Sequence, residues 1–119
     1  MSRTEASRAG RVGPAWVNAR DACYDSETVC WLCGDWVNQD LPRGHPYART
    51  ADHLIQLCHG GPPADRANLH LAHGRCNTAR SNKLRNLPVE QCACSHGLPC
   101  NVLQPSAPRG YVAVDLSTV

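Results

Sequence analysis

The stretch DHLIQLCHGGPPADRANLHLAHGRCNTARSNK, from Asp52 to Lys83, decides how this chain folds. It begins with an acid and a histidine beside a short apolar run, and it continues through a connector rich in glycine and proline. It ends with a histidine and a cysteine in front of a polar segment that favours a helix. The two ends could converge on one divalent cation, and this convergence is the central expectation.

The same stretch predicts two strands followed by a helix. Residues 50–57 favour a short strand, with Asp52 and His53 at its start and apolar residues after them. Residues 68–72 alternate polar and apolar side chains as a second strand, and the connector between the strands forces a turn. Residues 77–84 are adequate helix formers. We therefore expect a hairpin with a long loop, followed by a helix.

The composition leaves little material for a hydrophobic core. The chain has 119 residues, no phenylalanine, one methionine and 5% aromatic residues, so packing alone supplies limited stability. Its eight cysteines indicate either a secreted disulfide framework or metal sites. The first residues lack the apolar segment of a secretory signal, and no run is long enough to span a membrane. We therefore expect a cytoplasmic protein that uses its cysteines for zinc and has no membrane partner.

Residue types divide the chain into three regions. Residues 1–17 are rich in Arg, Ser, Gly and Ala, which predicts a flexible basic leader in which a Gly-Pro pair breaks any helix. Residues 18–88 form the expected core, and a short helix is expected over residues 16–25. Residues 89–119 form a cysteine-rich extension, in which residues 110–116 alternate like a final strand.

Two ligand pairs, each with two intervening residues, indicate a structural zinc site. Cys30 and Cys33 enclose Trp-Leu as in a zinc knuckle, where backbone amides of a tight turn point at the sulfurs. His73 and Cys76 supply the second pair. Four protein ligands leave no position for water or substrate, so such a site stabilises the fold. A redox-active pair is the competing interpretation, disfavoured because no thioredoxin-like strand and helix surround it.

Asp52, His53 and Asn77 form a second constellation, with the chemistry of phosphate ester hydrolysis. Carboxylate and amide oxygens are hard ligands, so Asp52 and Asn77 are candidate ligands of a catalytic Mg²⁺, Mn²⁺ or similar cation. Adjacent residues of a strand point to opposite faces. His53 could therefore stay off the metal and act as the general base that activates water. A hydrogen-bonded Asp-His pair without catalytic function is the alternative.

A cationic strip is the candidate surface for DNA. The net charge of +2 is only weakly basic, but four cationic residues lie close together with no acidic residue between them: Arg75, Arg80, Lys83 and Arg85. Contacts from such residues to phosphates position a duplex without reading its sequence. A solvated helix face is the alternative interpretation.

The extension carries a third group of side chains with the chemistry of zinc ligands. This group could form a second structural zinc site, with Cys23 in place of one member. Its members are Cys92, Cys94, His96 and Cys100. We interpret His59 and His70, which lie near the Asp-His motif, as surface or core histidines rather than as contacts to substrate.

Over residues 30–83 the ordered combination of motifs resembles the His-Asn-His (HNH) endonucleases, particularly the small zinc-containing forms of phages and prophages. The motifs that carry the resemblance are Cys30-x-x-Cys33, Asp52-His53, Gly60-Gly61, Asn68-Leu69 and His73-x-x-Cys76-Asn77. It implies a small zinc-stabilised ββα-metal fold of the α+β class, with irregular N- and C-terminal extensions. It also implies that His53 is the general base, that Asn68 fixes the loop that orients it, and that Asn77 binds the catalytic metal.

By the same resemblance, the function is hydrolysis of DNA phosphodiester bonds, in a phage setting linked to replication or packaging beside terminase subunits. The sequence departs from the family at Asn77, where many members have His, and at His73, where Cys is commoner. An alternative registration makes His73 a ligand of the catalytic metal and abandons the zinc site. A non-catalytic zinc-binding module that contacts DNA or a protein partner is the alternative function.

Overall fold

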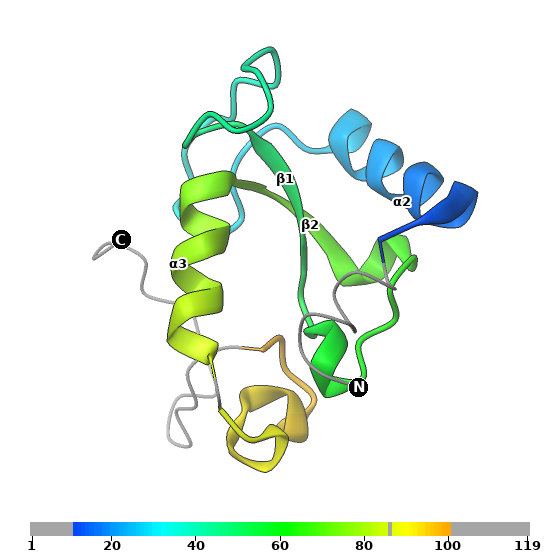
Figure 1. Ribbon diagram of the computed structural model, residues 1–119, viewed down its shortest axis with the longest axis vertical. Coiled ribbons are helices and arrows are strands. Elements are labelled where there is room, and N and C mark those ends of the chain that lie inside the picture. Colours follow the sequence, from blue (N-terminus) through cyan, green and yellow to red (C-terminus); the bar gives the residue numbers. More distant parts are fainter. Residues whose placement is uncertain (1–10, 86, 101–119) are drawn as a thin grey trace.

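The computed structural model describes residues 11–85 and 87–100 (Figure 1). Their helices and strands are α2 (Gly13–Ser26), β1 (Arg49–His53), β2 (Leu69–His73) and α3 (Gly74–Leu84). The structure is a small α+β fold, in which α2 and α3 lie on opposite sides of the hairpin (Figure 1). The strand expected over residues 110–116 lies outside the described residues. No helix in the described part of the chain is long and apolar enough to cross a lipid bilayer.

The predicted hairpin is confirmed, with a shift along the first strand. β1 and β2 pair antiparallel, from Arg49 opposite His73 to His53 opposite Leu69. Asp52 and His53 therefore end β1 rather than begin it. The pairing stops after His53, because at Ile55 the Asn68 side chain takes the place of a strand backbone. Its amide oxygen accepts from the Ile55 N–H, and its amide nitrogen donates to the Ile55 carbonyl. The apolar residues that favoured a strand lie instead in the loop that follows.

Helix α2 covers one side of the hairpin. The expected helix over residues 16–25 is confirmed, but it begins at Gly13, so the predicted break at the Gly-Pro pair is wrong. Pro14 fits the first turn because the N–H that proline lacks has no partner there in any helix. Trp16 and Cys23, two turns apart, are both buried and face the sheet side of the helix.

The buried apolar residues form two separate groups. The main core includes Trp16, Leu69 and Leu71, and three cysteines belong to it as well: Cys23, Cys30 and Cys76. A small core contains Leu84 together with Cys92 and Cys100 and a few partly buried neighbours. Helix α3 contributes to both groups, because its buried face runs the length of the helix.

Candidate metal centres and catalytic pocket

The first predicted zinc group is assembled in the structure. The ligand atoms of Cys30, Cys33, His73 and Cys76 all lie within 4.8 Å of one another. The His73 Nδ1 atom is 3.4 Å from the Cys33 sulfur and 3.8 Å from the Cys76 sulfur. Tetrahedral zinc with ordinary bond lengths separates nitrogen and sulfur ligands by about 3.5 Å. The group could therefore hold a metal such as zinc, and placing His73 among three cysteines disfavours the alternative registration.

Backbone contacts orient the ligands of this group. The His73 Nε2 atom lies 3.0 Å from the Trp36 carbonyl oxygen. Because a carbonyl only accepts, Nε2 carries the proton, and the Nδ1 lone pair faces the sulfurs. Burial raises the pKa of the Cys30 thiol, although nearby backbone N–H groups oppose that rise. Burial also raises the pKa of Cys76, and the neighbouring thiols raise it further. At neutral pH these thiols stay protonated unless a cation takes the place of the proton.

The second group of metal-ligand residues differs from the predicted one. Cys92, Cys94 and Cys100 come together as expected, but the fourth member is His59, which the sequence analysis interpreted as a surface or core histidine. The predicted member His96 is exposed and outside the group. Cys23 belongs to the main core and does not join this group either. The four assembled ligand atoms lie within 4.8 Å of one another and could also hold a metal.

The three residues of the predicted catalytic constellation line one pocket. Asp52, His53 and Asn77 surround a cavity of about 130 Å³, which Arg11 and Ser81 also line. A cavity of this size admits several water molecules. Arg11 lies in the segment predicted to be a flexible leader, and no motif in the sequence marks it as a pocket residue.

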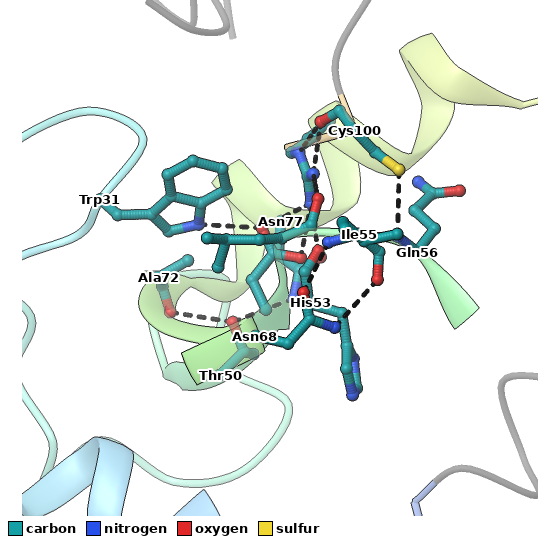
Figure 2. A network of polar contacts seen from close by, with 12 residues as sticks. Trp31, Thr50, His53, Ile55, Gln56, Asn68, Ala72, Asn77 and Cys100 are labelled. Atoms are coloured by element: carbon teal, nitrogen blue, oxygen red, sulfur yellow. Dashed lines mark hydrogen bonds and ion pairs between the residues drawn. The ribbon is translucent and has the colours of Figure 1, made fainter. Parts of the chain in front are cut away.

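Asp52 is held by a buried arginine. Its carboxylate accepts from Arg80 Nη1 at 2.9 Å and from Trp31 Nε1 at 3.0 Å, and the Arg80 guanidinium also lies over the Trp31 ring. Figure 2 shows the polar network that joins Trp31 to Cys100 through this region. Burial raises the pKa of Asp52, and the Arg80 charge and the indole N–H oppose that rise. The Arg80 guanidinium therefore balances the negative charge of the Asp52 carboxylate without any bound cation.

Assigning Arg80 to a DNA-contacting surface is thus wrong. Only 2% of its area is exposed, and besides Asp52 it donates to the backbone carbonyls of His53, Leu54 and Cys100. Its burial follows from helix geometry, since residue 80 lies one turn from Cys76 on the inner face of α3. The other three residues of the predicted strip, Arg75, Lys83 and Arg85, are exposed.

His53 has a defined tautomer. Its Nε2 atom lies 2.9 Å from the Pro63 carbonyl, so Nε2 donates and Nδ1 keeps a lone pair. The ring stacks on Trp16 of α2, with centroids 5.4 Å apart. Burial lowers the pKa of His53 below its usual 6.5, although the Pro63 carbonyl and Asp52 oppose the shift. The imidazole is therefore neutral at pH 7 and able to accept a proton.

Asn68 fixes the loop that carries this carbonyl. Its amide oxygen accepts from the Ile55 N–H at 2.9 Å, and its amide nitrogen donates to the carbonyls of Ile55 and Pro62, each at 3.1 Å. Pro62 immediately precedes Pro63. The side chain of Asn68 thus holds both ends of the loop against the start of β2, and the His53 ring is positioned through that loop.

The orientation of the Asn77 amide follows from its neighbour. The Thr50 hydroxyl donates to the Ala72 carbonyl at 2.9 Å, so its oxygen must accept the 3.2 Å contact from Asn77 Nδ2. The amide oxygen of Asn77 then points away from Thr50. Asp52 and Asn77 thus both line the pocket, and Arg80 and Trp31 already donate to the Asp52 carboxylate.

Comparisons with models of protein families, with curated proteins and with solved structures found no match for this chain. In the described residues, the chain has two Cys-His groups that could hold a metal such as zinc, and a pocket lined by His53.

Proposed function

We propose that this protein is a metal-dependent DNA endonuclease of the HNH type, with a ββα-metal unit formed by β1, β2 and α3. The observation that carries the proposal is that Asp52, Asn77 and a neutral His53 line one pocket. The first zinc group adds support, because it ties the segment before β1 to the junction between β2 and α3. Zinc in that group would be structural, and the catalytic cation would be Mg²⁺, Mn²⁺ or another divalent ion.

In the proposed reaction His53 is the general base. Nδ1 accepts a proton from a water molecule as the water oxygen bonds to phosphorus. The bond from phosphorus to the leaving deoxyribose oxygen breaks, and that oxygen takes a proton from solvent. The Pro63 carbonyl, fixed by Asn68, keeps the other ring nitrogen protonated. A cation held by Asp52 and Asn77 would stabilise the negative charge that develops on the phosphate oxygens. The buried Arg80 pairs with the Asp52 carboxylate and fixes its position beside the pocket.

DNA would lie across the mouth of this pocket. Arg11 lines the pocket, and the exposed Arg75 and Lys83 extend positive charge along α3. Contacts from such side chains to phosphates depend on salt and carry little sequence information. A phage setting, a cytoplasmic location and terminase subunits as partners stay predictions of the resemblance.

The test is cleavage of supercoiled plasmid in Mg²⁺ and in Mn²⁺ by the full chain. Replacing His53 by Ala should lower the rate by about 10²–10⁴-fold, because a general base contributes that factor. His45→Ala is the matched control, since His45 is exposed and lies outside the pocket, and it should cleave like the wild type. Zinc content and folding should be the same in all three proteins. An unchanged rate in His53→Ala would contradict the proposal.

A non-catalytic zinc-binding module is the second candidate, and one observation favours it. The Asp52 carboxylate already has a buried arginine partner, which weakens its attraction for a cation. Under this alternative, the wild-type protein binds DNA and cleaves none with any divalent metal. DNA binding measured beside cleavage, by fluorescence anisotropy, separates the two functions.

A further inference from the structure

We propose that a second zinc ion binds to His59, Cys92, Cys94 and Cys100, and that it fastens residues 87–100 to the loop after β1. The ligands come from two distant parts of the chain, because His59 lies between the strands and the cysteines follow α3. The proposal does not depend on nuclease activity. The zinc ion would hold residues 87–100 against the rest of the fold.

The distances fit a tetrahedral ion. His59 Nδ1 is 3.3 Å from the Cys100 sulfur and 3.5 Å from the Cys94 sulfur, close to the separation of about 3.5 Å between nitrogen and sulfur ligands of zinc. With Cys92, all four ligand atoms lie within 4.8 Å. Three sulfurs and one imidazole are a donor set that zinc prefers over magnesium or calcium.

The surroundings orient these ligands as in the first group. His59 Nε2 lies 3.2 Å from the Leu87 carbonyl, which fixes the proton on Nε2 and turns the Nδ1 lone pair toward the sulfurs. The Gln56 N–H donates to the Cys100 sulfur at 3.1 Å. Such backbone donors stabilise a thiolate. The exposed neighbour Cys58 has no part in the group.

Packing gives this segment little other support. Cys92 and Cys100 are fully buried, but the small core around them adds only Leu84 and the partly buried Ile55, Leu87 and Cys94. Ordering a segment costs backbone conformational entropy at every residue. So few apolar contacts do not offset that cost over residues 87–100, whereas a structural zinc ion can.

The second site also connects to the pocket. The Cys100 carbonyl accepts from Arg80 Nε at 2.9 Å, and Arg80 holds the Asp52 carboxylate. The Cys100 N–H in turn donates to the Leu54 carbonyl, directly after β1. A metal that binds Cys100 therefore positions one of the acceptors that keep Arg80 against Asp52.

The test is the number of zinc ions per purified full chain, measured by mass spectrometry of the metal. We expect two ions in the wild type and one in both His59→Ala and Cys94→Ser. Two matched controls, Cys58→Ser and His96→Ala, should keep two ions, because these residues lie outside the group. Hydrogen exchange in the one-ion variants should increase over residues 54–60 and 87–100 and stay unchanged in β2.

A measurement on the wild type covers the case in which a variant fails to fold. After exchange with ¹¹³Cd, the NMR spectrum should contain two cadmium signals, one of them coupled to the His59 ring. One zinc ion in the wild type would overturn the proposal. So would loss of an ion from His96→Ala with two ions kept in His59→Ala, since the ligand would then be His96.

Discussion

The two Cys-His groups have the same donors, three cysteines and one histidine, but different surroundings. Cys30 and Cys76 belong to the main core, together with Leu69 and Leu71 of β2. The second group lies in the small core, at the end of the described chain. Identical metal chemistry can therefore have different consequences, because a metal stabilises only the segments that its ligands connect. The first group connects the elements of the fold, and the second connects an extension to it.

The largest expected effect is loss of the first group. Cys76→Ser should leave the chain without a cooperative unfolding transition, because structural zinc binding is worth about 10–16 kcal/mol in small domains, as much as such a domain's total stability. Circular dichroism during heating measures this. Cys94→Ser should keep a cooperative transition. If both variants melt alike, the difference between the two groups disappears.

Removing Arg80 should have the next largest effect, because this residue links the two regions. Arg80→Met keeps the apolar stem but leaves the Asp52 carboxylate buried without its partner, at a cost of about 3–5 kcal/mol. Urea unfolding at pH 7 measures the loss. Asp52→Asn combined with Arg80→Met should recover part of it, since the buried charge is then gone. A double variant no more stable than Arg80→Met would show that the backbone acceptors, not the ion pair, dominate.

Asn68→Ala should destabilise the protein by about 2–3 kcal/mol. It removes three hydrogen bonds to the loop that carries His59, each worth about 1 kcal/mol. The rate of amide hydrogen exchange should rise in residues 55–63 and stay unchanged around Cys30. That result would show that the loop with His59 and the first Cys-His group are stabilised independently. Asn38→Ala, at a partly exposed site outside this loop, is the control. Equal exchange changes in both regions would contradict the separation.

The smallest effect concerns a carboxylate that supports the main core without metal. Burial tends to raise the pKa of Glu27, but the Leu71 N–H, His70 and Arg66 together hold it below its usual 4.5. Its contribution is therefore present above pH 4.5 and is lost as the pH falls through the lowered pKa. Glu27→Gln should cost about 1–2 kcal/mol at pH 7. The difference from wild type, measured by urea unfolding, should shrink below pH 4.5, and a constant difference would contradict this.

The first zinc group and the hairpin could be predicted because their signals are local. Each ligand pair spans a single turn, and strand alternation is visible within five residues. His59 carries no such signal, since its partners follow more than thirty positions later and His96 offers a closer spacing. Only the fold of the loop decides between the two histidines, and that loop is fixed by Asn68, directly before β2.

Arg80 could have been placed correctly by a more careful use of periodicity. Cys76, Arg80 and Leu84 are spaced by four residues and share one helix face, and all three are buried. The positive charge of Arg80 favours the surface, whereas its spacing favours the buried face. Asp52 is the ion-pair partner that stabilises the buried guanidinium, and no local sequence pattern predicts this contact.

β2 ends at His73 and α3 begins at Gly74, so strand passes into helix with no loop between them. A residue inserted at this junction would rotate α3 by about 100° and turn its inner face outward. Added residues in the exposed turn over residues 42–44 would lengthen only a surface loop, which belongs neither to a Cys-His group nor to the pocket. Fusion partners or sensor peptides therefore belong in that turn, and never at the junction.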